Sequence, residues 1–440
     1  MEKPAVFTPD EIERFKAELA SKRVAGAYEP GRWSLSPLNR RAEVVGPVPA
    51  SIRLRDATLR SVETLPGVVA TEEAKQDYLR RLVRAGVSEV VLAGVRGRKL
   101  DELKAEVALI KGENPDCLAT CPLVFTPEAI DLAQAAGYDG VQIWVPPFGE
   151  ASLIYSRIYP DAWAGREWRT PQTPRTRTAV LSHAGALIEH ARDRGLRVST
   201  PMLMVSYLTD EMLAESVQVL VGAGATELTL FDGPGAMSPE AYGFLVAQTK
   251  ALAPDVEVGL HPHNTFGLAV ACAVAAAKAG ADVVELSVNG YCGGPGNADL
   301  AATALAFEAL YGVSTGIHTE QLTALSRAGE ALTGYHVAWN HPLTGRDAFC
   351  WGGMDLITQE TVVDPLLHNC LEPAIVGNAR RVPLTLDSGG YGMAEILGRL
   401  GIEASHAQVD AALAACHDLM RREQRLLTDE DVRSVAARTV

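Results

Sequence analysis

A repeated order of helical pattern, glycine and apolar strand pattern constrains the fold of this chain more than any other feature. A glycine at a helix end suits the left-handed conformation that terminates helices, and the apolar run after it is typical of a buried strand. A chain that repeats this order builds βα units around a parallel sheet. The four junctions are Gly86 before residues 89–92, Gly137 before 141–144, Gly224 before 228–231 and Gly280 before 283–286.

Four more apolar segments of strand length lie between these repeats, so eight strands are expected, with helical patterns between them. Eight strand–helix units over about 250 residues are typical of a TIM (β/α)8 barrel. A doubly wound open sheet is the competing architecture, but no Gly-x-Gly-x-x-Gly segment follows the first strand. We therefore predict an α/β TIM barrel. The four strands are residues 52–54, 118–124, 196–203 and 256–260, and helices include 71–84, 101–111, 209–221 and 239–252.

Three segments are expected along the chain. Residues 1–49 contain one helix pattern and a linker, residues 50–315 form the barrel, and residues 316–440 form a helical C-terminal accessory subdomain. Residues 147–176 form a long connection that contains four arginines. Connections of this length often serve as lids or binding elements.

The composition narrows the possible functions. A net charge of -14 argues against binding to nucleic acid or to an acidic membrane. Seven cysteines without a Cys-x-x-Cys motif fit free thiols in a reducing compartment. An uninterrupted apolar run of about 18 residues is missing, so no transmembrane helix is expected. We therefore predict a cytoplasmic protein that binds neither nucleic acid nor a membrane.

Two histidines follow the seventh predicted strand. His261 and His263 are two residues apart, so on a strand they present two imidazoles to the same point, as a divalent metal site requires. Barrel active sites lie at such C-terminal strand ends. Asn297, after the eighth strand, could add a carbonyl oxygen. The alternatives are core histidines with ordinary hydrogen bonds, and Asn297 as the cap of the helix that follows it.

Four segments in this order resemble the metal-dependent Claisen-type synthase and lyase superfamily, with its pyruvate carboxyltransferase-type domain. That superfamily includes the 2-isopropylmalate, homocitrate and citramalate synthases and, more distantly, hydroxymethylglutaryl-CoA lyase. Weaker matches extend the resemblance to about residue 400. The segments are Asp56-Ala57-Thr58-Leu59-Arg60-Ser61-Val62-Glu63, Leu230-Phe231-Asp232-Gly233-Pro234-Gly235, His261-Pro262-His263-Asn264-Thr265-Phe266-Gly267, and Asn289-Gly290 with Gly296-Asn297-Ala298.

The resemblance implies a divalent metal, Mn²⁺, Mg²⁺ or Zn²⁺, that is bound by an acid together with His261, His263 and Asn297. Such a metal chelates a 2-oxo acid and polarises its carbonyl group. A second carbonyl compound, usually acetyl-CoA, is deprotonated at carbon and attacks. The expected partners are therefore a 2-oxo acid and an acyl-CoA, and the same resemblance implies a homodimer.

Two residues of the first segment are predicted to be catalytic. The resemblance places Arg60 beside the metal, where an arginine stabilises the developing oxyanion, and assigns Glu63 to the same site. From the residues alone, Arg60 could instead form a structural ion pair with Asp56 or Glu63, and Glu63 could simply orient Arg60. The leading hypothesis is an acyltransferase of the 2-isopropylmalate synthase type that forms a carbon–carbon bond.

The sequence departs from the family pattern at the metal site. Ser61 stands where the family has an acidic metal ligand, and a neutral hydroxyl is a poor replacement for a carboxylate on a hard cation. Asp56 or Glu63 could supply the acid, or the metal site could be rearranged or absent. We assign Ser61 to substrate binding.

A thiol enters the same site. Cys292-Gly293-Gly294 replaces the Gly-Glu-Arg of the synthases and is closer to the lyase branch. We predict that Cys292 is catalytic, as a general acid or nucleophile; the alternative is a small buried thiol. The competing functions are therefore a carbon–carbon lyase or hydrolase, or a non-catalytic protein. The remaining residues predicted to bind substrate are Asp232, Asn264, Asn289 and His368.

Overall fold

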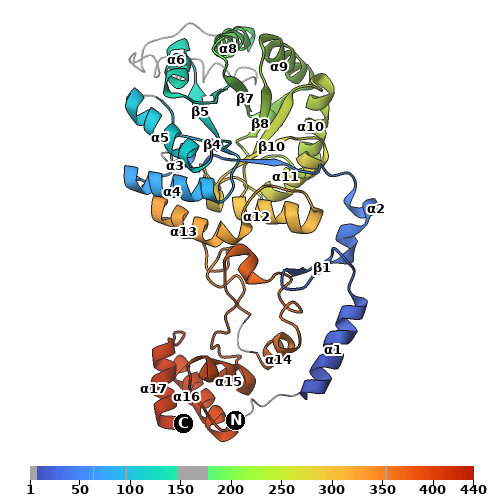
Figure 1. Ribbon diagram of the computed structural model, residues 1–440, viewed down its shortest axis with the longest axis vertical. Coiled ribbons are helices and arrows are strands. Elements are labelled where there is room, and N and C mark those ends of the chain that lie inside the picture. Colours follow the sequence, from blue (N-terminus) through green and yellow to red (C-terminus); the bar gives the residue numbers. More distant parts are fainter. Residues whose placement is uncertain (1–6, 63, 96, 146–176, 352–353) are drawn as a thin grey trace. The chain divides into compact units, whose positions relative to one another are not determined.

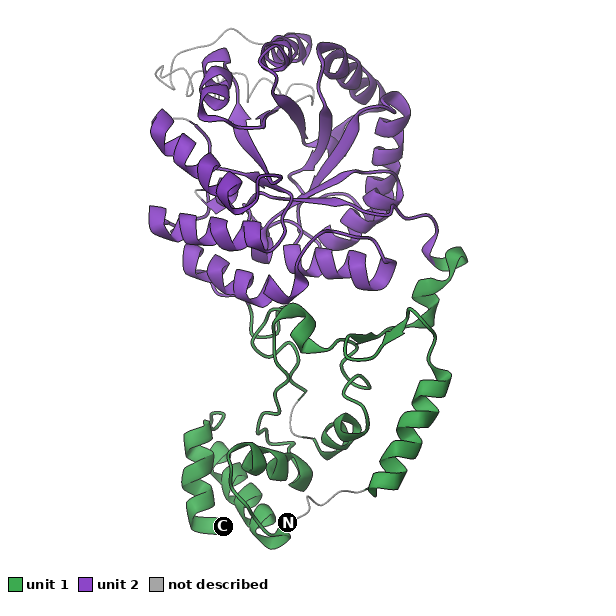
Figure 2. Cartoon of the chain, in the orientation of Figure 1, with its two compact units in different colours: residues 1–44, 338–440 green, residues 45–337 purple. Residues whose placement is uncertain are grey.

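The computed structural model describes residues 7–62, 64–95, 97–145, 177–351 and 354–440. The chain forms two compact units, coloured separately in Figure 2. One unit is the continuous segment Val45–Val337. The other combines Met1–Val44 with Ala338–Val440. The boundaries predicted at residues 49 and 315 remain a prediction about domains, because a compact unit need not fold independently.

The unit Val45–Val337 is built on a closed barrel of eight parallel strands within the described residues, in the order β10-β3-β4-β5-β6-β7-β8-β9. The predicted TIM barrel is confirmed, and all eight predicted strands form. Pairing of β10 with both β3 and β9 closes the barrel, with Leu286 opposite Asp56 and Val284 opposite Leu260. The strands are β3 (Arg53–Asp56), β4 (Glu89–Val91), β5 (Leu118–Val124), β6 (Gly140–Ile143), β7 (Arg197–Leu203), β8 (Glu227–Asp232), β9 (Glu257–Pro262) and β10 (Val283–Leu286).

Helices surround these strands (Figure 1). Several begin at a threonine or serine whose hydroxyl accepts a hydrogen bond from one free backbone N–H group of the first turn, as Thr71 and Ser238 do. The predicted glycine caps are left-handed: Gly137 has φ 90° and Gly224 has φ 105°. The helices are α3 (Thr58–Val62), α4 (Glu72–Arg84), α5 (Leu100–Glu113), α6 (Pro127–Ala136), α8 (Arg177–Arg192), α9 (Asp210–Ala223), α10 (Pro239–Leu252), α11 (Ala269–Lys278), α12 (Leu300–Leu305) and α13 (Leu322–Thr333). The short helix α2 (Ala42–Val45) is not one of them and ends at the first residue of this unit.

The second unit is mainly helical. Its C-terminal helices share an apolar core that includes Met393, Ile396, Cys416 and Val435. A short antiparallel pair of strands lies in the segment that the sequence predicted as linker, and Trp33 of this pair bridges to Leu371. The elements are α1 (Pro9–Lys22), β1 (Tyr28–Glu29), β2 (Trp33–Ser34), α14 (Asp355–Val363), α15 (Gly390–Arg399), α16 (His406–Glu423) and α17 (Asp429–Thr439).

Two expectations from composition can be compared with the structure. All seven cysteines are free thiols. In the described ranges, no helix combines the length and the apolar character needed to cross a membrane. The cytoplasmic location stays a prediction.

Candidate metal centre and active site

Three neighbouring strands bring the predicted site residues together. His261 lies near the end of β9, and His263 follows it directly. Cys292 lies in the loop after β10, and Arg60 and Ser61 lie on α3, which follows β3. Because β10 pairs with both β9 and β3, these three C-terminal ends are adjacent. The location agrees with the end of a TIM barrel that carries chemistry.

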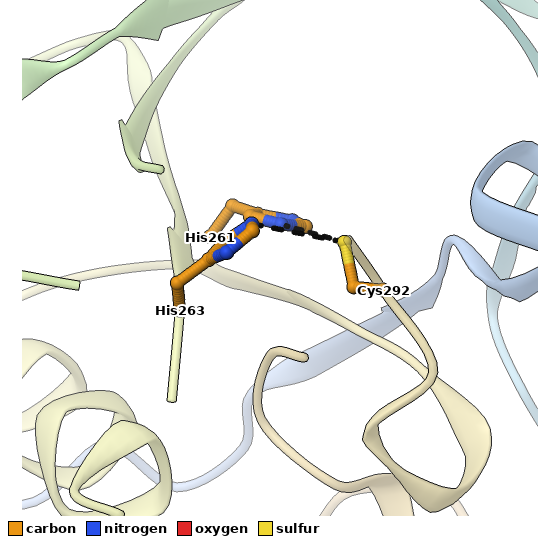
Figure 3. Close-up of side chains that lie close together, drawn as sticks. All are labelled: His261, His263 and Cys292. Carbon is orange, nitrogen blue, oxygen red and sulfur yellow. Dashed lines mark hydrogen bonds between the residues drawn. The ribbon is translucent and has the colours of Figure 1, made fainter. Parts of the chain in front are cut away.

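Two imidazoles and one thiol converge (Figure 3). The Sγ atom of Cys292 lies 3.8 Å from Nε2 of His261 and 3.7 Å from Nε2 of His263. One donor atom from each of the three residues can be chosen so that all lie within 4.8 Å of one another. His261 is fully buried, and Cys292 is 9% exposed. The spacing of the two histidines therefore predicted their convergence correctly.

A buried carboxylate fixes the orientation of this cluster. Oε1 of Glu285 lies 3.0 Å from Nδ1 of His261 and 3.1 Å from Nη1 of Arg60. Its other oxygen accepts a hydrogen bond from Gln142 at 2.6 Å and lies 3.5 Å from Nη1 of Arg55. An ionised carboxylate can only accept, so Nδ1 of His261 carries a proton, and Nε2, which faces Cys292, is the nitrogen that a metal would use. A metal-binding histidine commonly has such a carboxylate on its other nitrogen.

A network of charges supports Glu285 in the barrel interior. The fully buried Arg55 pairs with Glu89 at 2.9 Å and with Glu227 at 2.8 Å, in addition to Glu285. Glu89, Glu227 and Glu285 are all nearly inaccessible to solvent. Buried carboxylates persist only when cations and hydrogen bonds compensate their lost hydration. Arg55 and Arg60 supply those cations.

Aromatic rings enclose Arg60. Its guanidinium carbon lies 5.2 Å from the ring centroid of Trp144 and 5.6 Å from that of Phe231. Phe231 also stacks on His261 with 3.9 Å between centroids and 7° between planes. The rings hold the arginine and the histidine in place and limit water around them, which strengthens electrostatic interactions there.

Arg60 does not form the ion pair with Asp56 that was one of its structural alternatives. Arg60 pairs with Glu285. The carboxylate of Asp56 instead accepts hydrogen bonds from Thr58 and Tyr78, and its role as a substitute for the acidic ligand remains a prediction. Glu63 lies outside the described residues, so its predicted role remains a prediction.

Asn297 presents a free carbonyl oxygen. It is 1% exposed and bridges to His263 through the backbone. Its Nδ2 donates to Ser287 at 3.1 Å, whereas Oδ1 is buried and accepts no hydrogen bond from the described residues. The helix cap alternative does not apply, because Asp299 caps α12 through Ala302. A buried carbonyl without a donor fits a cation, and together with two imidazoles it fits a divalent metal.

The ionisable groups of the site perturb one another. Burial opposes ionisation of Cys292, but its hydrogen bonds with His261 and His263 and the nearby charge of Arg60 lower the pKa of this thiol well below its ordinary value. Burial likewise opposes ionisation of Glu285, but Arg60 and His261 hold its pKa below its ordinary value. Burial lowers the pKa of His261, and hydrogen bonds with Cys292 and Glu285 outweigh it and raise the pKa. Perturbed groups of this kind are typical of functional sites.

Other predicted residues lie in structural contacts. Asp232 accepts hydrogen bonds from Ser206 and from the backbone of Met237. Asn264 accepts from the backbone of Ala269 at the start of α11. Asn264 follows His263 directly, and Asp232 lies opposite Pro262 in the pairing of β8 with β9, but both use their side chains to hold loops. Their predicted roles in substrate binding remain predictions.

Two further candidates use their side chains elsewhere. Asn289 adopts a left-handed backbone with φ 57°, and its Nδ2 donates to Ser326 of α13. His368 belongs to the other compact unit, where Nδ1 lies 2.6 Å from Oε2 of Glu360. The long connection predicted as a lid, residues 147–176, lies outside the described residues.

The sequence interpretation missed the residues that orient the site. These are Glu285, Gln142, Trp144 and Phe231, which all lie on barrel strands or directly after them. A usable signal was present for Glu285: an acidic residue interrupts the apolar run Val283–Leu286. A charged side chain on a buried strand is costly unless it is paired, so Glu285 could have been expected to have a cationic or hydrogen-bonding partner inside the barrel.

The fold and the converging donors define a TIM-barrel protein with a candidate divalent-metal site. Residues 168–328 match the model of the HMGL-like family. A Methanopyrus kandleri protein named as an (R)-citramalate synthase is 32% identical over 398 residues, which covers 90% of this chain and 74% of that protein. The chain therefore belongs to the HMGL-like family, and the family-level resemblance is confirmed.

Two further comparisons agree. A 2-isopropylmalate synthase of Sulfolobus acidocaldarius is 26% identical over 389 residues, covering 88% of this chain and 96% of that protein. The crystal structure of HMG-CoA lyase from Bacillus subtilis superposes with a TM-score of 0.55 at 18% identity, over 66% of this chain and 96% of that one. At that identity the structural match supports the fold alone.

Proposed function

We propose that this protein joins a 2-oxo acid to an acyl-CoA by metal-assisted carbon–carbon bond formation. The observation that carries the proposal is the convergence of the imidazoles of His261 and His263. Asn297, whose buried carbonyl accepts no hydrogen bond from the described residues, lies opposite His263 in a backbone bridge. Arg60 shares the carboxylate of Glu285 with His261. Relatives named as citramalate and 2-isopropylmalate synthases support the same class of reaction. A divalent cation bound by His261, His263 and Asn297 would polarise the carbonyl of the 2-oxo acid.

Arg60 is suited to stabilise negative charge on that carbonyl oxygen. Arg60 is 7% exposed, and its guanidinium lies beside aromatic rings and is held by Glu285. A charge fixed in a site with little water stabilises a developing oxyanion more strongly than it would in water, with no reorganisation during the reaction. Ser61 accepts from Nη2 of Arg60 at 3.4 Å and so helps to fix the guanidinium plane.

The overall chemistry balances without a redox partner. The acyl-CoA loses a proton from the carbon next to its thioester carbonyl, and that carbon forms a bond to the keto carbon of the 2-oxo acid. The keto oxygen takes up a proton and becomes a hydroxyl group. Water then hydrolyses the thioester, which releases CoA as the free thiol and leaves a hydroxy diacid.

CoA release tests the proposal. Free CoA, measured by chromatography over a panel of acyl-CoAs and 2-oxo acids, should form only when both substrates are present. Arg60→Ala should lower kcat by about 10²–10³-fold, the loss typical when one oxyanion donor is removed. Arg53→Ala is the matched control, because Arg53 begins β3 at the opposite end and pairs with Glu257. CoA release from the thioester alone, or full activity of Arg60→Ala, would contradict the proposal.

One observation favours a second candidate, a lyase or hydrolase on the same barrel. Cys292 contacts both imidazoles, as an activated thiol acting in general acid or nucleophilic catalysis would. This function predicts turnover of a single substrate, loss of activity on thiol alkylation and indifference to a chelator. Absence of turnover with every substrate would favour the non-catalytic alternative. The homodimer stays a prediction that sedimentation can measure.

A further inference from the structure

The position of the family's acidic metal ligand is occupied by a side chain that carries no charge. Ser61 is 2% exposed and follows Arg60 on α3. Its hydroxyl donates to the Sγ atom of Cys292 at 3.5 Å. The hydroxyl of Ser61 and the thiol of Cys292 therefore share the space where a longer, anionic side chain would otherwise reach the cluster.

The geometry of the thiol matches that of a metal ligand. Sγ of Cys292 lies 3.8 Å and 3.7 Å from the two imidazole Nε2 atoms. Across a tetrahedral zinc, a thiolate sulfur and an imidazole nitrogen are separated by about 3.6 Å, since Zn–S bonds are about 2.3 Å and Zn–N bonds about 2.0–2.1 Å long. The observed separations thus leave room for one small cation between the three atoms.

A second, independent observation points to a cation in the same place. Oδ1 of Asn297 is buried and accepts no hydrogen bond from the described residues, although the amide nitrogen is held by Ser287. Asn297 lies opposite His263 in an antiparallel bridge, and the side chains of two opposite residues lie on the same face. Two imidazoles and one thiolate make three donors, the number that a catalytic zinc takes from a protein, which leaves a further position for the carbonyl of Asn297 or for a substrate oxygen.

We propose that Cys292 supplies the anionic metal ligand that Ser61 cannot supply, and that the site selects a borderline-soft divalent cation such as Zn²⁺ over Mg²⁺ or Mn²⁺. The exchange of a carboxylate for a thiolate keeps one negative charge on the ligand set and changes its softness. Thiolate and imidazole ligands suit zinc, whereas carboxylate, carbonyl and water suit magnesium and manganese. On metal binding, the thiol proton passes to solvent.

This inference deepens the proposed function and rests on it for the role of the metal. It gives Cys292 a different task from the catalytic one that the sequence suggested. A thiol that binds the metal is not free to act as nucleophile or general acid. Loss of activity on alkylation does not distinguish a metal ligand from a catalytic thiol, because a blocked Sγ atom can serve as neither.

Cobalt spectroscopy of the full chain without substrates tests the ligand directly. Co²⁺ added to metal-free protein should produce a sulfur-to-cobalt charge-transfer band in the near ultraviolet, together with the intense visible bands of a tetrahedral site. Cys292→Ser should lose the charge-transfer band. Cys272→Ser is the matched control and should keep it, because Cys272 is a buried thiol on α11 that donates to the backbone of Met237.

Metal competition measures the selectivity. Wild-type protein dialysed against equal concentrations of Zn²⁺, Mn²⁺ and Mg²⁺ should retain zinc, near one per chain, by mass spectrometry. Cys292→Ser should weaken zinc binding by more than the roughly 10–100-fold typical of residues that only support a ligand. In the double variant Ser61→Asp/Cys292→Gly, which returns an acid to position 61, the ratio of bound zinc to bound manganese should fall.

Several results would overturn the inference. They are one bound Co²⁺ without a charge-transfer band in the wild type, a band that survives Cys292→Ser, no metal binding, or an unchanged zinc-to-manganese ratio in the double variant. If Cys292→Ser does not fold, Cys292→Ala takes its place in the same comparison. CoA release without the band would leave the proposed function standing and remove Cys292 from the ligands. A charge-transfer band without CoA release would keep Cys292 among the ligands and contradict the proposed function.

Discussion

Glu285 and His261 form a buried pair in which Oε1 of the carboxylate lies 3.0 Å from Nδ1 of the imidazole. The two residues lie on adjacent strands, β10 and β9. The contact determines which nitrogen of His261 carries the proton, and it directs Nε2 to Cys292. The same oxygen holds Arg60, so one carboxylate positions both the candidate metal ligand and the candidate oxyanion donor.

Substitution of this carboxylate should weaken metal binding. In Glu285→Gln an amide can still accept from Nδ1, but the negative charge that strengthens His261 as a ligand and holds Arg60 is lost. We expect metal affinity to fall by about 10–100-fold, the usual effect of removing a residue that orients a ligand. Competition with a chromophoric chelator measures this affinity. Glu257→Gln, which removes a partner of Arg53 and Arg197, is the control. Equal affinities would contradict the positioning role.

Alanine variants of Asn297 and Asp299 should distinguish a metal ligand from a helix cap. Asn297→Ala removes the free Oδ1, so it should lower metal affinity with little change in the unfolding free energy of the metal-free protein. Asp299→Ala removes the hydrogen bond to Ala302 and should cost about 1 kcal/mol of stability, as loss of a helix cap does. Metal titration and urea unfolding of both variants check this. The opposite pattern would make Asn297 a structural residue.

Arg55 should be essential for stability. Arg55→Met leaves Glu89 and Glu227 without this cation in the barrel interior, and leaves Glu285 with Arg60 as its remaining arginine partner. Breaking a buried ion pair in this way costs about 3–5 kcal/mol. Urea unfolding measures the loss. Arg84→Ala, which breaks a solvent-exposed pair with Glu113, should have a much smaller effect. Similar midpoints for both variants would show that the buried network does not stabilise the barrel.

Asp56 should make stability fall as pH rises. Burial raises the pKa of Asp56 to about 6 from an ordinary value of 3.8, although hydrogen bonds from Thr58 and Tyr78 oppose the shift. Between these two values the folded protein holds a proton that the unfolded chain releases, so unfolding free energy decreases with increasing pH. At about 1.36 kcal/mol per pKa unit, the total decrease is about 3 kcal/mol.

The matching variant is Asp56→Asn, which removes this titration. Relative to Asp56→Asn, the wild type should therefore lose about 2.4 kcal/mol between pH 4 and pH 7, most of it below about pH 6. Urea unfolding of both proteins at several pH values gives the difference. Parallel pH profiles would show that Asp56 is not protonated in the folded state at pH 5.

Much of the fold could be predicted from short stretches of sequence. The left-handed caps at Gly137 and Gly224, each followed by an apolar run, were sufficient to predict parallel strands because helix ends and strand periodicity are local properties. The two-residue spacing of His261 and His263 likewise predicted rings on one face, and their centroids are 5.1 Å apart. The short strands β1 and β2 were missed because two-residue strands carry no periodicity.

The sequence by itself determined the barrel, the pair of histidines at its C-terminal end, and the exchange of an acid for Ser61 alongside a new thiol at Cys292. Only the tertiary structure decided that these two changes meet, with Oγ of Ser61 3.5 Å from Sγ of Cys292 across 231 residues of chain. It also decided that Glu285 orients His261 and that Asn297 is not a cap. Such contacts depend on which strands are neighbours and on how each loop leaves its strand. Those relations arise only when the closed sheet brings distant segments together, so no local pattern contains them.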